Sequence, residues 1–109
     1  MEKLVNMYFE YFNRHDIEEL SDLFDHNISL EDWNIKVEGL ANVLAANSQI
    51  FSDHPEIMVD VVRTSFVNNI AFAEVKIDIG DGKRLDVLDV IETDHSQIKI
   101  LKISAFRKF

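Results

Sequence analysis

The chain has 109 residues, a formal net charge of −9 and no cysteine, and 47% of its residues are hydrophobic. This length fits one domain with a buried core, and the negative charge argues against nucleic acids and anionic membranes as partners. The absence of cysteine excludes disulfides and thiolate metal sites, and the four histidines lack metal-ligand spacing. With no membrane-length apolar run and no secretory signal, we expect a cytoplasmic protein.

The first half of the chain predicts three helices. Residues 2–14 place Leu4, Tyr8, Tyr11 and Phe12 on one helical stripe. Asp16 is predicted to cap a second helix that runs to about residue 24, with Glu19 completing a capping box. A third helix, about 40–51, follows Gly39 and ends at Ser52-Asp53-His54-Pro55. Its buried side carries Leu40, Val43 and Leu44, with Asn47 and Phe51 as further candidates.

The remaining elements are predicted to be strands. A short strand at 28–33, between the second and third helices, places Ile28, Leu30 and Asp32 on one face. Four further strands are expected at 57–67, 70–79, 84–93 and 98–107. Because their connections are short, we expect an antiparallel meander. Helices followed by a meander indicate an α+β fold with the helices on one sheet face.

The strand at 70–79 has one wholly apolar set of alternating side chains. The two sets are Ile70, Phe72, Glu74, Lys76 and Asp78 against Ala71, Ala73, Val75, Ile77 and Ile79. Alternation alone assigns the second, apolar set to the core.

The strand at 84–93 carries an acid among aliphatic side chains. Asp89 shares a face with Leu85, Val87 and Ile91. Either its carboxylate stays solvated or paired with a lysine, or it is buried and protonated so that it donates a hydrogen bond.

Tyr8, Asp32 and Asp89 stand out as a chemical set. Taken singly, Tyr8 is explained as a core aromatic residue and Asp32 as a solvated charge at a strand end. Asp89 has the two alternatives given above. Together, a phenol and a protonated carboxyl facing a carboxylate supply the groups for proton transfer next to a carbonyl.

Several segments resemble those of the ketosteroid isomerases, in the SnoaL-like, nuclear transport factor two-like superfamily. At the family's spacing stand Met7-Tyr8, Asp16-Ile17-Glu18, Leu30-Glu31-Asp32, Leu85-Asp86-Val87-Leu88-Asp89-Val90 and Ala105-Phe106. The resemblance covers nearly the whole chain. It implies a single domain over residues 1–109, with a cone-shaped, cystatin-like α+β fold: three N-terminal helices packed on a curved, mostly antiparallel sheet.

The same resemblance implies a function. Asp32 would be the general base, and Tyr8 and Asp89 the oxyanion donors, in an isomerase-like reaction that needs no cofactor; a neutral aspartic acid donor is a known feature of ketosteroid isomerase. Phe24 and Asn47 stand where the family has supporting tyrosines, and Trp33 where it usually has proline. The alternatives are a SnoaL-like cyclase or other small-molecule enzyme, and a non-catalytic ligand-binding or dimerisation module.

The resemblance also implies which residues line the pocket. Besides Phe24 and Asn47, these would be Phe72, Glu74, Lys76, Leu85, Val87, Ile103, Ala105 and Arg107. Glu74 and Lys76 are close enough on one strand face to pair with each other, or they are solvated. Arg107 would hold an acidic group of a ligand smaller and more polar than a steroid. The alternative is that the last strand frays near residue 107 and Arg107 is solvated. A pocket lined by Phe72, Glu74 and Lys76 reverses the alternation argument, because Ala73, Val75 and Ile77 would then lie on the outside with Leu88 and Val90. An apolar outer face needs a cover, and we expect a homodimer interface there.

Overall fold

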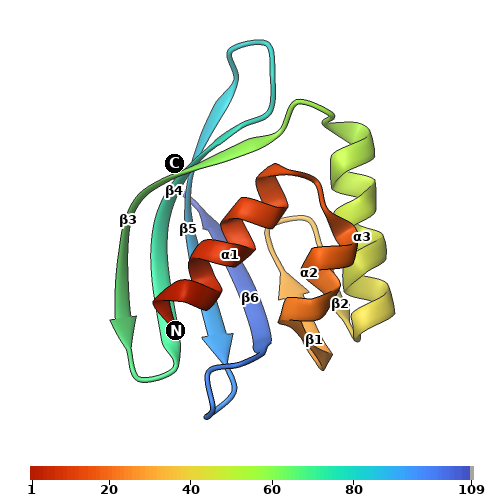
Figure 1. Cartoon of the computed structure of the whole chain (residues 1–109). Coiled ribbons are helices and arrows are strands. Elements are labelled where there is room, and N and C mark those ends of the chain that lie inside the picture. The colour runs from red at the N-terminus through yellow and green to blue at the C-terminus, as the bar shows by residue number, and fades with distance from the viewer. Residues whose placement is uncertain (109) are drawn as a thin grey trace.

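The computed structural model describes residues 1–108 and shows an α+β fold of three helices and one six-stranded sheet (Figure 1). The helices are α1 (Glu2–Asn13), α2 (Ile17–Leu23) and α3 (Leu40–Asp53). The strands are β1 (Phe24–Glu31), β2 (Lys36–Glu38), β3 (Met58–Val67), β4 (Ile70–Asp78), β5 (Arg84–Thr93) and β6 (Ile100–Arg107). The predicted helices and meander are therefore confirmed, with small shifts at their ends.

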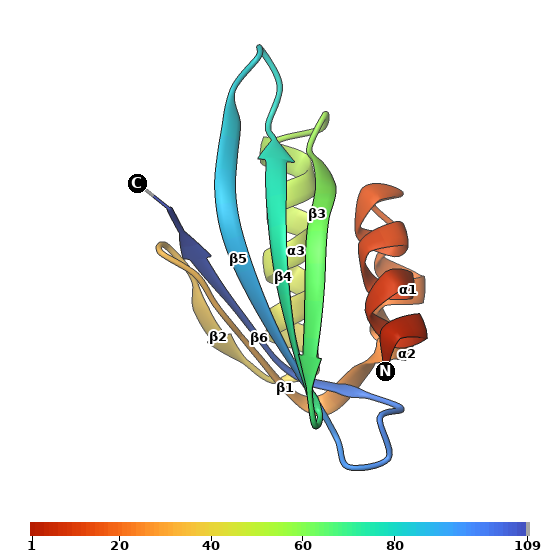
Figure 2. The same ribbon diagram turned by 90° about the vertical axis from the view of Figure 1, so that its left-hand side faces the viewer.

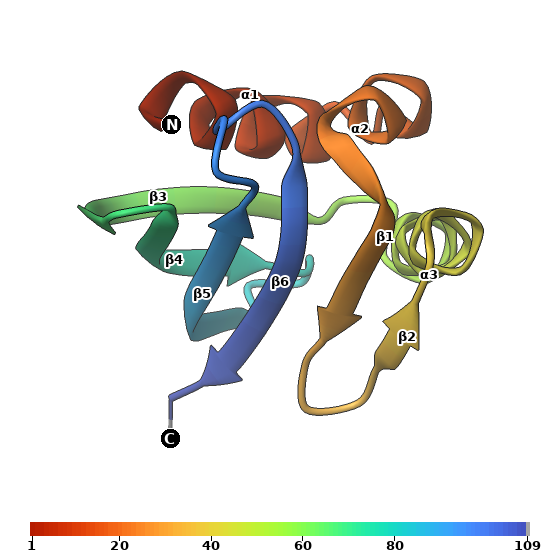
Figure 3. The same ribbon diagram turned by 90° about the horizontal axis from the view of Figure 1, so that it is seen from below.

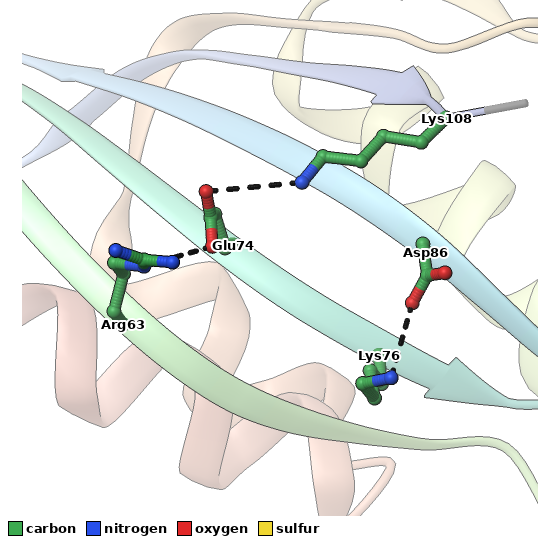
Figure 4. A network of polar contacts seen from close by, with 5 residues as sticks. All are labelled: Arg63, Glu74, Lys76, Asp86 and Lys108. Carbon is green, nitrogen blue, oxygen red and sulfur yellow. Dashed lines mark hydrogen bonds and ion pairs between the residues drawn. The ribbon is translucent and has the colours of Figure 1, made fainter.

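The sheet has the strand order β2-β1-β6-β5-β4-β3. All neighbouring strands are antiparallel except β1 and β6, which run parallel. Figure 2 shows the bend of the long strands, and Figure 3 shows α3 alongside β1 and β2. Figure 4 looks onto the sheet face that the helices do not cover, which we call the outer face. The face toward the helices is the inner face.

The helices form where the apolar pattern predicts them. α1 buries Leu4, Tyr8 and Phe12 of the predicted stripe, together with Val5 and Phe9. Asp16 caps α2, because its side chain accepts a hydrogen bond from the Glu19 backbone N–H at 3.1 Å. No described helix is both long and apolar enough to cross a membrane.

Two boundaries differ from the sequence prediction. Phe24, expected at the end of the second helix, begins β1, and the strand expected at 28–33 ends at Glu31. Asp32 and Trp33 therefore lie in the turn to β2. β2 was not predicted at all, because a three-residue strand is too short to show a period of two.

The orientation of β4 follows the alternation argument and contradicts the one taken from the resemblance. Ala71, Ala73 and Val75 are buried on the inner face. Asp89 pairs with Ala73 on one side and Ala105 on the other, and directly opposed residues in an antiparallel ladder share a face. The expectation that Ala73, Val75 and Ile77 lie outside is therefore wrong.

Candidate functional site

A cavity of about 1060 Å³ lies between the helices and the inner face of the sheet. Tyr8 of α1, Asp32 of the β1–β2 turn and Asp89 of β5 all line it. Each comes from a different part of the chain, so the fold brings the three predicted chemical groups together on one cavity.

Asp89 reaches the cavity from the middle of β5. Its neighbours on the inner face, Val87 and Ile91, are buried, and its partners on the adjacent strands are Ala73 and Ala105. These two alanines leave the space beside the carboxyl open, whereas larger side chains would fill it. The alternation of β5 predicted from the sequence is thus confirmed.

Burial shapes the acidity of both predicted donors. It raises the pKa of Asp89 to about 7, and the nearby negative charge of Asp32 adds to the shift. Burial also raises the pKa of the Tyr8 phenol well above its ordinary value, with a further contribution from Asp89. The expected upward shift for Asp89 is confirmed. Below pH 7 both groups carry protons and can donate hydrogen bonds to a ligand oxygen.

The Asp32 carboxylate is held by the turn in which it lies. Its Oδ1 accepts hydrogen bonds from the backbone N–H groups of Asn34 and Ile35, each at 2.7 Å. The Asp32 N–H donates to the Ile35 carbonyl at 2.8 Å. The residue therefore has a structural role in the turn, which a solvated strand end would not have. The same bonds fix its carboxylate on the cavity wall, and Oδ2 makes no hydrogen bond with the part of the chain described.

Phe24 and Asn47, which stand where the family has supporting tyrosines, supply no hydrogen bond to the Tyr8 hydroxyl. Phe24 packs against the Tyr8 ring, with 6.1 Å between ring centroids, and lies in the core beside the cavity wall. Asn47 lines the cavity, but its Nδ2 donates to the Val43 carbonyl of its own helix at 3.1 Å. Among residues 1–108 no side chain is hydrogen-bonded to the Tyr8 hydroxyl, so a ligand would meet this group directly.

Three predicted pocket residues lie on the outer face instead. Phe72, Glu74 and Lys76 alternate with the buried alanines of β4 and point away from the cavity. Glu74 and Lys76 also do not pair with each other. Glu74 contacts Arg63 at 2.9 Å and Lys108 at 3.7 Å, whereas Lys76 contacts Asp86 at 3.4 Å (Figure 4).

The other predicted wall residues lie on the inner side. Leu85, Ile103, Ala105 and Arg107 line the cavity, while Val87 is buried in the core beside it. The Arg107 guanidinium lies over the Trp33 ring, 5.9 Å from its centroid.

Sequence reasoning missed the residues contributed by loops and by β2. The cavity is also lined by Trp33, Lys36, His54, Lys83 and Arg84. These positions come from three separate segments and share no motif, so only the tertiary fold brings them together.

Comparison with known proteins agrees with this architecture. Residues 5–100 match the family model of the SnoaL-like domain. A comparison with curated proteins gives no match.

Solved structures share the fold. A candidate ketosteroid isomerase from Kribbella flavida has a TM-score of 0.82 and 22% identity, covering 98% of this chain and 76% of that one. A candidate polyketide cyclase from Sinorhizobium meliloti has a TM-score of 0.85 and 17% identity, covering 96% and 94%. A protein of unknown function with a cystatin-like fold, from Methylobium petroleophilum, has a TM-score of 0.87 and 16% identity, covering 99% and 75%.

These identities show a shared fold alone, whereas the family match spans most of the chain. The chain belongs to the SnoaL-like domain family.

Proposed function

We propose that this protein catalyses a cofactor-free proton transfer on a small carbonyl compound, in the manner of a ketosteroid isomerase. The observation that carries the proposal is the position of Tyr8, Asp32 and Asp89 on one cavity. An acid with a raised pKa beside a carboxylate is the pairing that such chemistry needs.

The proposed reaction uses the three groups in two roles. The Tyr8 hydroxyl and the protonated Asp89 carboxyl donate hydrogen bonds to the substrate carbonyl oxygen. The Asp32 carboxylate removes a proton from the carbon next to that carbonyl, and the two donors stabilise the enolate that forms. Asp32 then returns the proton at the far carbon of the conjugated system, so the double bond moves and no group is gained or lost.

Conversion of a β,γ-unsaturated cyclohexenone, followed by the ultraviolet absorbance of the conjugated product, tests the proposal. Asp32→Asn should reduce kcat/KM by about 10²- to 10⁴-fold, the usual contribution of a general base. Asp25→Asn is a matched control, because Asp25 lies on β1 and accepts a similar turn hydrogen bond, from Asn27 N–H at 2.9 Å, but does not line the cavity. Unchanged turnover in Asp32→Asn would reject the base.

One observation favours a second function. The Tyr8 hydroxyl lacks the supporting hydrogen bonds that the resemblance implies, since Phe24 and Asn47 do not reach it. The alternative is a SnoaL-like cyclase that uses Asp32 on another substrate, or a binding module without catalysis. Ligand binding in wild type and Asp32→Asn alike, without conversion of any ketone by either, would favour the binding module.

A further inference from the structure

Four cationic side chains line the cavity although the chain as a whole is acidic. They are Lys36 of β2, Lys83 before β5, Arg84 at the start of β5, and Arg107 at the end of β6. They make up four of the chain's 11 lysines and arginines, and the acids on the same wall are three: Asp32, Asp53 and Asp89. A surplus of positive charge on one concave wall of a chain with a net charge of −9 favours an anionic ligand there.

The cations gather at one end of the sheet. Because β6 runs parallel to β1 and antiparallel to β5, the end of β6, the β1–β2 turn and the β4–β5 hairpin lie at the same end of the strands. In Figure 2 the hairpin extends above the other two. Arg84 contacts Asp78 at 3.9 Å, so its charge is partly offset. Lys36 and Lys83 form no ion pair with another residue among 1–108, which leaves their charges directed to solvent and cavity.

Arg107 is the cation best placed to meet a ligand that reaches the catalytic groups. It lies two residues beyond Ala105 on the inner face of β6, and Ala105 pairs with Asp89. Same-face neighbours on a strand are about 7 Å apart, so a small molecule can span from Asp89 to the guanidinium. The guanidinium contacts the ring of Trp33, which lies in the same turn as Asp32. This contact holds the guanidinium at the cavity rim. A guanidinium fork suits bidentate binding of a carboxylate.

The deeper wall is apolar. Phe9, Phe12, Leu30, Ile57 and Ile103 line the cavity away from the cationic rim. A ligand that fits this arrangement has an apolar body, a carbonyl and one anionic end.

We propose that the substrate is a carboxylate-bearing ketone, whose carboxylate binds Arg107 at the cationic rim while its carbonyl faces Tyr8 and Asp89. The orientation of the carbonyl rests on the proposed function. The selection of an anionic ligand rests on the rim alone.

Calorimetric titration with benzoylbutyrate and with its neutral methyl ester tests the proposal. The acid should bind at least about tenfold more tightly than the ester, and only the acid should weaken when salt is raised. Arg107→Gln should weaken the acid by about tenfold to a hundredfold, the usual effect of losing a hydrogen bond to a charged group, and should leave the ester unchanged.

Two matched controls remove the same charges away from the cavity. Arg63→Gln is the control for Arg107→Gln, because Arg63 is exposed and pairs with Glu74 on the outer face. Lys3→Gln, on the exposed side of α1, is the control for removing a lysine charge from the cavity. Neither control should change the affinity ratio of acid to ester. If Arg107→Gln does not fold, as judged by circular dichroism, the double variant Lys36→Gln/Lys83→Gln should still lower this ratio.

Equal binding of acid and ester would overturn the inference, as would absence of acid binding at millimolar concentration or equal losses in Arg107→Gln and Arg63→Gln. The proposed function fails in a different way: Asp32→Asn would leave turnover of the neutral cyclohexenone unchanged. That result would not alter the charge dependence of binding, so the two failures can be told apart.

Discussion

The Asp89 carboxyl is the residue whose protonation state governs the site. Its burial among Val87 and Ile91, and the negative charge of Asp32, both disfavour the ionised form. The same environment that makes a charge costly keeps the carboxyl protonated below pH 7, where it can donate a hydrogen bond. The raised pKa of Asp89 is therefore expected to affect stability below pH 7 and activity above it.

Stability should fall with rising pH over the range in which unfolded Asp89 is ionised and folded Asp89 still holds its proton. Its folded-state pKa, about 7, is above the ordinary value of 3.8, so between these pH values the folded chain keeps a proton that the unfolded chain has released. Stability from this group is complete below pH 3.8 and is lost as the pH rises to 7, by at most about 1.4 kcal/mol per pH unit. In urea denaturation, Asp89→Asn should gain stability relative to wild type from pH 4 to pH 8. An equal difference at both pH values would contradict the buried-acid assignment.

Activity should follow the ionisation of Asp89 in the folded chain. If neutral Asp89 donates to the substrate oxygen, kcat/KM should decline above pH 7, where its carboxyl ionises. Asp89→Asn should lose this decline, because an amide donates at every pH, and should retain much of the activity. Asp89→Leu should be severely impaired. A wild-type pH profile that is flat from pH 6 to pH 9 would exclude the donor role.

At the scale of elements, the cavity depends on how α1 is attached to β3. The Asn13 side chain, at the end of α1, donates to the Val59 carbonyl at 2.9 Å and accepts from the Val59 N–H at 2.7 Å. Val59 lines the cavity. Tyr8, which precedes Asn13 on α1 by about one and a half turns, also lines it. This paired contact therefore sets the distance between the helix that carries Tyr8 and the sheet.

Removal of the Asn13 amide should be costly. Asn13→Ala leaves two backbone groups of β3 without their side-chain partner, which should lower the free energy of unfolding by about 2–3 kcal/mol. Urea denaturation followed by circular dichroism measures this change. Asn42→Ala is the control, since its Nδ2 bonds to the Glu38 carbonyl at 3.0 Å on an exposed part of α3. A loss no larger than that of the control would show that the contact is not needed.

At the scale of the whole molecule, the outer face is the surface available for self-association. It carries apolar residues on adjacent strands, namely Phe72, Leu88, Val90 and Phe106, flanked by the ion pairs of Figure 4. Phe106 is 57% exposed. We propose that two copies pack through this face as a homodimer. This differs in composition from the interface first expected, because Ala73, Val75 and Ile77 face inward.

Light scattering tests the dimer. At micromolar concentration the wild type should have the mass of two chains. Phe106→Lys should lower the measured mass toward that of one chain, because a buried unpaired charge disfavours the interface. Ile98→Lys is a matched control, because Ile98 is 64% exposed in the turn between β5 and β6. Val75→Lys would instead unfold the chain, as Val75 lies in the core. A wild-type mass of one chain would reject the dimer.

Much of the fold and the central triad could be predicted from the sequence, because they depend on local periodicity and spacing. The Leu4–Tyr8–Phe12 stripe, the Asp16 cap and the alternation around Asp89 each involve neighbours along one element. Local physics is sufficient for such features. Their chemistry grouped Tyr8, Asp32 and Asp89 as one set, and the resemblance then assigned their roles.

Tertiary structure alone decided which side of the sheet faces the cavity and what surrounds the triad. A one-residue change of register turns every side chain of a strand to the opposite face, so the position of Phe72, Glu74 and Lys76 depended on the pairing of β4 with β5. The cationic rim likewise joins Lys36, Lys83 and Arg107 from three separate segments. Their proximity arises from strand order, a long-range property that no local pattern in the sequence encodes.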